Sequence, residues 1–205
     1  MDDGAWGSYW VIYDGSSQPN VYKFSVGGLT TGTSYWFKLQ SLNINGYSDF
    51  SPVETISACL KPTGLNAPFK IETTISSIKI GWTEPNDNGC PITTYKIFWD
   101  TGAGDLITQP VDEAIVENKP SLWEHTTSAG LTTSGATYRF KIWAINDAGF
   151  VDSDPLSVIL ASVPVTPTNG PYSDALITDE TKLMVLFDPI PTGNTGGSNI
   201  ISYEL

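Results

Sequence analysis

The chain has little positive charge. Its 205 residues include 10 lysines and arginines against 22 aspartates and glutamates, Arg139 is the single arginine, and the formal net charge is -12. Nucleic-acid binding by counterion release needs clustered Lys and Arg side chains. We therefore expect no nucleic-acid partner. The acid excess fits a solvated, self-repelling surface, or a partner that is cationic or a metal ion.

Long apolar runs are also missing. A membrane helix needs about 18 or more apolar residues, and the longest candidate, 156–165, is interrupted by Ser157, Ser162 and Pro164. The first four residues are acidic and polar, unlike a signal peptide. We expect no membrane insertion in this segment.

Histidine and cysteine are too few for the common catalytic and zinc sites. The single histidine, His125, has no nucleophile motif beside it, so the pattern favours a strand residue over a catalytic base. Cys59, Cys90 and His125 lack zinc-finger spacing. No glycine-rich loop is followed by the lysine of a phosphate cradle. The sequence predicts a chain that is not an enzyme and needs no cofactor.

What the chain does contain favours short strands. Charged residues make up only 16%, while hydrophobic residues reach 40% and aromatic residues 12%, enough to bury a core. Thr, Ser, Gly and Pro are abundant, a mixture typical of strands joined by turns. Alternating apolar residues predict strands at 78–82, 95–99 and 138–145.

The sequence repeats itself. Residues 35–43 (YWFKLQSLN) match residues 138–146 (YRFKIWAIN), and the offset of 103 (138 − 35) continues through Gly46 and Gly149 to Asp49 and Asp152. Residues 82–85 (WTEP) and 88–95 (NGCPITTY) correspond to 186–189 (LFDP) and 196–203 (GGSNIISY). Residues 1–5 (MDDGA) resemble 99–103 (WDTGA). We therefore expect a piece of a longer array, in which Met1 is not an initiator.

These residues resemble the fibronectin type III module. The complete copy carries Trp82 and Pro85, then the 88–95 and 138–146 motifs, Gly149 and Ser153. The resemblance implies an all-β fold of tandem immunoglobulin-like sandwiches, one complete module flanked by two partial ones. The expected modules are 1–60 (end of strand C to strand G), 61–163 (complete) and 164–205 (strands A to C). Tyr35 and Tyr138 resemble tyrosine corners, whose hydroxyl binds the turn that follows Leu29 or Leu131.

Within this frame, some segments fit better than others. Residues 22–26 of the first copy alternate cleanly and predict a strand, whereas their counterpart, 123–129, does not, so we expect a register shift or bulge there. The acidic segment 109–120 is longer than usual, and the sequence does not place it.

The two cysteines lie where consecutive modules should meet. In the implied topology Cys59 ends the last strand of the first copy, and Cys90 lies in the loop between the second and third strands of the next. The matching positions one junction later are Ser162 and Ser198. We predict a Cys59–Cys90 disulfide, the alternative being two unrelated small core residues. A structural disulfide favours a secreted or cell-surface protein, although the lack of any Asn-x-Ser/Thr sequence is a weak mark for an intracellular one.

Two further surfaces are weaker candidates. By alternation Phe98, Trp143 and Ile145, and Trp36 in the first copy, point away from the core. They predict a protein interface, unless the 109–120 segment covers them. Oxygen-bearing side chains at one end of the central module are weak calcium candidates, against the alternative that they only form turns; these are Glu84, Asp87 and Asp147, near Asn86, Asn88 and Asn146.

Three functions remain open. The first is a structural or adhesive segment of a secreted or cell-surface array, acting as a strut or filament-forming unit whose partners are other proteins or further copies. The second is an intracellular cytoskeletal or ciliary scaffold built from the same modules. The third is a non-catalytic spacer in a large enzyme. Repeated modules with short linkers, such as 60–63, give length with limited bending.

Overall fold

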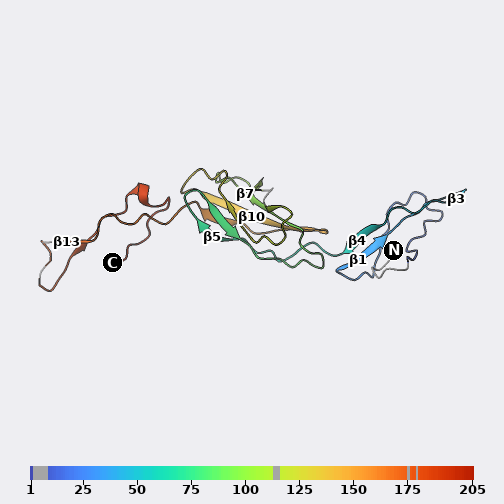
Figure 1. The fold of residues 1–205 in the computed structure, drawn as a ribbon, viewed down its shortest axis with the longest axis horizontal. Coiled ribbons are helices and arrows are strands. Elements are labelled where there is room, and N and C mark those ends of the chain that lie inside the picture. The colour runs from blue at the N-terminus through green and yellow to red at the C-terminus, as the bar shows by residue number, and fades with distance from the viewer. Residues whose placement is uncertain (2–8, 113–115, 175, 179) are drawn as a thin grey trace.

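The computed structural model describes residue 1 and residues 9–112, 116–174, 176–178 and 180–205. Figure 1 shows three segments in a row along the longest axis, with a sandwich in the middle. The described elements are β-strands and one short 3-10 turn, η1 (Thr192–Asn194). None of the described residues belongs to a helix with the length and hydropathy needed to cross a bilayer.

The central module is a sandwich of two antiparallel sheets. The first sheet has the order β5-β6-β9, and the second has the order β11-β10-β7-β8 with β12 also on β10. The bounds are β5 (Phe69–Thr73), β6 (Ile78–Gly81), β7 (Thr94–Trp99), β8 (Gln109–Pro110), β9 (Glu124–Thr127), β10 (Thr137–Asn146), β11 (Gly149–Asp152) and β12 (Leu156–Ile159). Because β11 and β12 pair with opposite ends of β10, they act as one interrupted edge strand.

The core lies between these sheets and uses the alternating residues of the predicted strands. Ile78 of β6, Tyr95 of β7 and Phe140 of β10 are fully buried, while Lys79, Lys96 and Lys141 between them are partly exposed. Period-two alternation places one side chain of each pair in the core. The strands predicted at 78–82, 95–99 and 138–145 are confirmed, and so is the all-β sandwich.

Both tyrosine corners form as predicted. The backbone N–H groups of Thr132 and Thr133 donate to Tyr138 Oη at 3.2 and 3.3 Å. In the first copy the N–H of Thr30 donates to Tyr35 Oη at 3.0 Å. Each hydroxyl therefore holds the turn that precedes its own strand.

The register shift predicted for 123–129 is wrong. β9 pairs with β6 without interruption, from Ile78 opposite Thr127 to Gly81 opposite Glu124. The bulge lies instead in β5, between Lys70 and Glu72. The apolar alternation was hidden because two inward positions of β9 are polar.

Those two positions are His125 and Thr127. Thr127 is buried, and His125 is half-buried with its Nε2 at 2.7 Å from Asp112 Oδ2. A hydrogen-bonded partner lowers the cost of burying a polar side chain. His125 is thus a strand residue, as predicted.

The 109–120 segment closes the open edge of the second sheet. Its β8 pairs with β7, with Pro110 opposite Phe98, and Val111 and Val116 are buried in the core. Residues 113–115 lie outside the described residues.

The first segment contains β1 (Thr33–Phe37) paired with β4 (Glu54–Ala58), and β2 (Leu42–Asn43) paired with β3 (Gly46–Tyr47). The strand predicted at 22–26 is wrong, since these residues have no regular pairing. Its counterpart β9 is held by β6. A strand needs a partner for its backbone groups, whatever its side-chain pattern.

The third segment repeats the start of the central module. β13 (Tyr172–Ser173) pairs with β14 (Val185–Leu186), with Ser173 opposite Val185. This pair corresponds to Phe69 opposite Gly81 after an offset of 104 for both partners (173 − 69 and 185 − 81). The module limits 1–60, 61–163 and 164–205 stay predictions, and the likeness of residues 1–5 to 99–103 falls mostly outside the described residues.

Candidate functional site at the first joint

The two cysteines meet between the first segment and the central module. Cys59 follows β4 directly, and Cys90 lies in the loop between β6 and β7. The structure joins them by a disulfide, with Sγ atoms 2.02 Å apart and Cα atoms 5.6 Å apart. Cys90 is buried and Cys59 is half-buried. The bond therefore crosses the point where one module leads into the next.

Hydrogen bonds hold the linker against the same loop. The N–H of Leu60 donates to the Asn88 carbonyl at 3.3 Å. Thr63 and Asn86 exchange two backbone hydrogen bonds, at 3.0 and 2.9 Å. The Asn88 side-chain amide donates to the Lys61 carbonyl at 2.8 Å and to Thr63 Oγ1 at 3.0 Å. The linker is thus hydrogen-bonded to the loop of the central module along its length.

Asn146, at the end of β10, connects the linker, the loop and the sheet. Its buried Nδ2 donates to the carbonyls of Leu60 and Asp87, both at 2.9 Å, and of Cys90 at 3.2 Å. Sequence reasoning treated Asn146 only as a neighbour of a calcium candidate and missed this role. The available signal was Asn43, which stands at the same place in the first copy.

Two glycines face each other closely across the joint. A Cβ on Gly89 would lie 2.8 Å from the backbone N of Gly32 and 2.8 Å from Thr31 Cγ2. Gly89 also has a φ of 91°, and Gly32 a φ of 82°. Both positive φ values suit glycine and strain a larger residue, and at Gly89 a Cβ would also collide with backbone.

Of the calcium candidates, Asp87 is engaged in a turn, and so are the neighbouring Asn86 and Asn146. Asp87 Oδ1 accepts from the N–H of Gly89 at 3.0 Å, Asn86 Oδ1 from Asn88 at 2.9 Å, and Asn146 Oδ1 from Ala148 at 3.0 Å. These are Asx turns, the alternative interpretation of the same residues. Glu84 and Asp147 are exposed. In the part of the chain that the structure describes, no three His, Cys, Asp or Glu side chains gather into a metal-binding group.

The aromatic residues outside the core stack on one another. Phe98 and Trp143 have ring centroids 4.6 Å apart, and Trp143 and Phe150 are stacked at 4.2 Å. Ile145 lies opposite Phe150 in register. Phe98, Trp143, Ile145 and Trp36 are all half-buried, while Phe150 is exposed. Their use as a protein interface stays a prediction.

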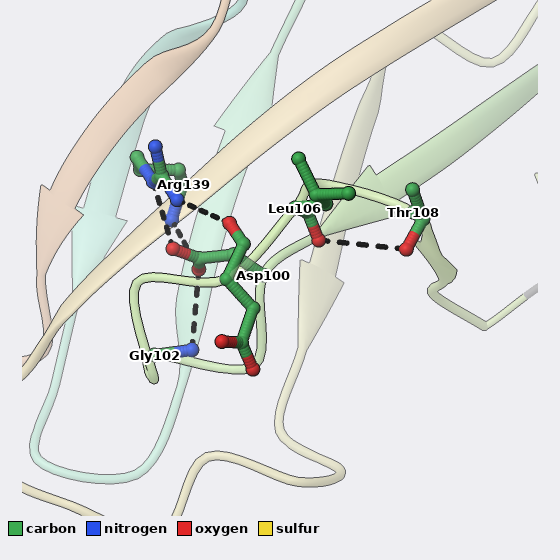
Figure 2. A network of polar contacts seen from close by, with 6 residues as sticks. Asp100, Gly102, Leu106, Thr108 and Arg139 are labelled. Carbon is green, nitrogen blue, oxygen red and sulfur yellow. Dashed lines mark hydrogen bonds and ion pairs between the residues drawn. The ribbon is translucent and has the colours of Figure 1, made fainter.

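A buried carboxylate, missed from the sequence, fixes the turn after β7. Asp100 accepts from the backbone N–H and the Nε of Arg139 at 2.9 and 2.8 Å, and from the Gly102 N–H at 3.1 Å (Figure 2). Burial alone would raise the pKa of Asp100, but these hydrogen bonds and the Arg139 charge outweigh it and lower the pKa. The signal available was that Arg139 is the sole arginine. Its role is structural.

The disulfide, the linker hydrogen bonds and the glycine contact thus all lie between the first segment and the central module.

No family model matches the chain. It is similar to "Fibronectin type III domain containing protein 3C1" of Mus musculus, with 24% identity over 204 residues. Similar relatives are "Myomesin-2" of Homo sapiens, at 26% over 188 residues, and "Fibronectin type-III domain-containing protein 3A" of Mus musculus, at 29% over 167 residues.

The alignments cover 95%, 89% and 78% of this chain but only 13%, 12% and 13% of those three proteins. Among solved structures, it is similar to domains of titin, with a TM-score of 0.45 and 19% identity, covering 65% of this chain and 43% of that one. The twitchin kinase region from C. elegans gives a TM-score of 0.42 and 19% identity, covering 56% of this chain and 19% of that one. The fold assignment itself rests on the strand order and register described above. The sequence relatives and the repeat establish that this chain is homologous to segments of large multi-module fibronectin type III proteins.

Proposed function

We propose that the chain is a structural or adhesive segment of a secreted or cell-surface array, working as a strut or filament-forming unit without catalysis. The observation that supports this is the Cys59–Cys90 disulfide across the first joint. Structural disulfides persist in oxidising compartments and are rare in the cytosol. A covalent clamp between modules suits a protein whose task is to keep its length and direction under load.

The energetic effect of the clamp has two parts. Cross-linking residues 31 positions apart stabilises the folded chain by about 2–4 kcal/mol in the chain-entropy model. It also restricts bending at the linker, which without the disulfide would be limited by non-covalent contacts. The modules in this proposal are residues 1–60, 61–163 and 164–205, and their partners are other proteins or further copies of the array.

The test is the oxidation state of the two cysteines in protein taken from its native source. The protein is denatured in excess alkylating agent, with and without prior reduction, and the peptides that contain Cys59 and Cys90 are weighed. We expect alkylation only after reduction. Free thiols at both positions would contradict the proposal and favour the intracellular scaffold built from the same modules.

A further inference from the structure

The hydrogen bonds of the first joint recur at the second. Ser162, in the linker after β12, donates its N–H to the Gly196 carbonyl at 2.8 Å. Three residues on, Val165 donates to the Asn194 carbonyl at 2.9 Å. The two donors are three residues apart in sequence, and the two acceptors are two residues apart. The first joint has the same spacing, since Leu60 donates to Asn88 and Thr63 donates to Asn86.

The glycine contact recurs as well. A Cβ on Gly135 would lie 2.8 Å from the Gly197 carbonyl oxygen, and a Cβ on Gly197 would clash with Ser134 Oγ. Gly135 and Gly197 have φ values of 84° and 89°, against 82° and 91° for Gly32 and Gly89. The same turn of one module thus receives the same loop position of the next at both joints.

The shared pattern shows which residues of the second joint take the places of the cysteines. The Leu60 donor corresponds to Ser162, so Cys59, one residue earlier, corresponds to Ala161. The Asn88 acceptor corresponds to Gly196, so Cys90, two residues later, corresponds to Ser198. The uniform sequence offset of 103 would instead have placed Ser162 at the position that corresponds to Cys59.

We propose that each module carries at its exit end a docking surface for the glycine of the following module's loop, so that both joints adopt one repeated geometry. The surface consists of the turn before the tyrosine-corner strand and the end of the last strand. Its occupant is the next module in the chain, provided that a glycine stands at the Gly89 or Gly197 position. This inference deepens the proposed strut role and rests on it. A repeated joint fixes the same rotation at each step, and the disulfide adds a lock at the first joint only.

The test places cysteines at the second joint of the full chain, in a background of Cys59→Ser and Cys90→Ser. The Ala161→Cys/Ser198→Cys pair is compared with the Ser162→Cys/Ser198→Cys pair after air oxidation, by the mass shift on alkylation with and without reduction. We expect the first pair to become fully cross-linked and the second, one residue out of register, to stay largely reduced. Failure of the first pair, or equal reaction of both, would overturn the shared geometry.

A glycine substitution tests the contact itself. Gly197→Ala, added to the Ala161→Cys/Ser198→Cys pair, should reduce the cross-linked fraction because the new methyl group blocks docking. The matched control is Gly104→Ala, which also has a positive φ, 79°, but open space around its Cβ position. An unchanged cross-linked fraction in the Gly197 variant would overturn the docking role. Because Cys59 and Cys90 are absent here, these outcomes do not depend on their oxidation state in native protein, which tests the function.

Discussion

Arg139 binds the Asp100 carboxylate twice, through its backbone N–H at 2.9 Å and its Nε at 2.8 Å. The Asp100 side chain is 1% exposed, whereas that of Arg139 is 35% exposed. Hydrogen bonds to a charged group contribute about 1.5–3 kcal/mol. Asp100→Asn should therefore lower the free energy of unfolding near neutral pH by an amount in that range, measured by urea unfolding.

The same pair gives a pH dependence of definite sign. The pKa of Asp100 is lowered in the folded state from 3.8, so its contribution is fully present above the unfolded pKa and is lost as pH falls through the folded one. The stability difference between the parent chain and Asp100→Asn should shrink in acid. Asp105→Asn is the control, because Asp105 is exposed and meets Arg139 only through its backbone carbonyl. A difference that stays constant into acid would contradict the assignment.

Two buried tyrosines should respond oppositely to loss of their hydroxyl. Tyr138 Oη accepts from Thr132 and Thr133, so Tyr138→Phe should destabilise the module by about 0.5–1.5 kcal/mol. Tyr95 Oη is buried with no hydrogen-bond partner among the described residues. Burial, with a smaller effect of Glu84, raises the pKa of Tyr95 to about 12.

Removing an unsatisfied buried hydroxyl costs little or is favourable. Tyr95→Phe should therefore leave the thermal midpoint unchanged or raise it, while Tyr138→Phe lowers it. Each variant serves as the other's control for loss of one oxygen atom. An equal decrease of the thermal midpoint in both variants would show that the hydrogen bonds of the tyrosine corner add nothing specific to stability.

Most of the central module was predictable because its strands bury one face. Ile78, Tyr95 and Phe140 each stand in an alternating run, and that pattern is a local property of the sequence. The Cys59–Cys90 pairing was reached through topology, since the two residues are far apart in sequence and only the sandwich brings them together. The prediction of a strand at 22–26 was wrong because a strand also needs a partner strand, which alternation within the segment does not reveal.

The register between the last strands of the first copy and the central module could not be determined from the sequence repeat alone. Ser51 donates its N–H to the Leu39 carbonyl, and Ser153 donates to Ile142. Leu39 and Ile142 are 103 positions apart, but Ser51 and Ser153 are only 102 apart, so the first copy has one extra residue before this point. Residue similarity does not reveal where such an extra residue is absorbed. Hydrogen bonding does, and it moves the counterpart of Cys59 from Ser162 to Ala161.

The disulfide predicts a coupled pair of mutational effects. Cys59→Ser or Cys90→Ser alone should each lower the free energy of unfolding by about 2–4 kcal/mol. The double variant should lose no more than either single variant, because both changes remove one bond. Urea unfolding with and without reductant provides the check. Reductant should bring the parent chain to the level of the variants and leave the variants themselves unchanged. Additive losses would mean that the cysteines act independently.

The stacked aromatics, Phe98, Trp143 and Phe150, separate local packing from lateral contact between copies. Aromatic pairs of this kind contribute about 0.5–1.5 kcal/mol beyond area burial, so Trp143→Ala, which breaks two pairs, should destabilise the module measurably in urea. Trp123→Ala is the matched control, since Trp123 is 51% exposed and takes part in neither of these two pairs.

Sedimentation at rising concentration tests the interface role. If this face binds a second copy, the parent chain should self-associate, and the Phe98→Ala/Trp143→Ala variant should stay monomeric while it remains folded at the temperature used. A parent chain that stays monomeric, or a double variant that associates equally, would leave the three rings with a packing role only. In that case Phe98, opposite Pro110 of β8, and Phe150 pack against Trp143 within a single copy.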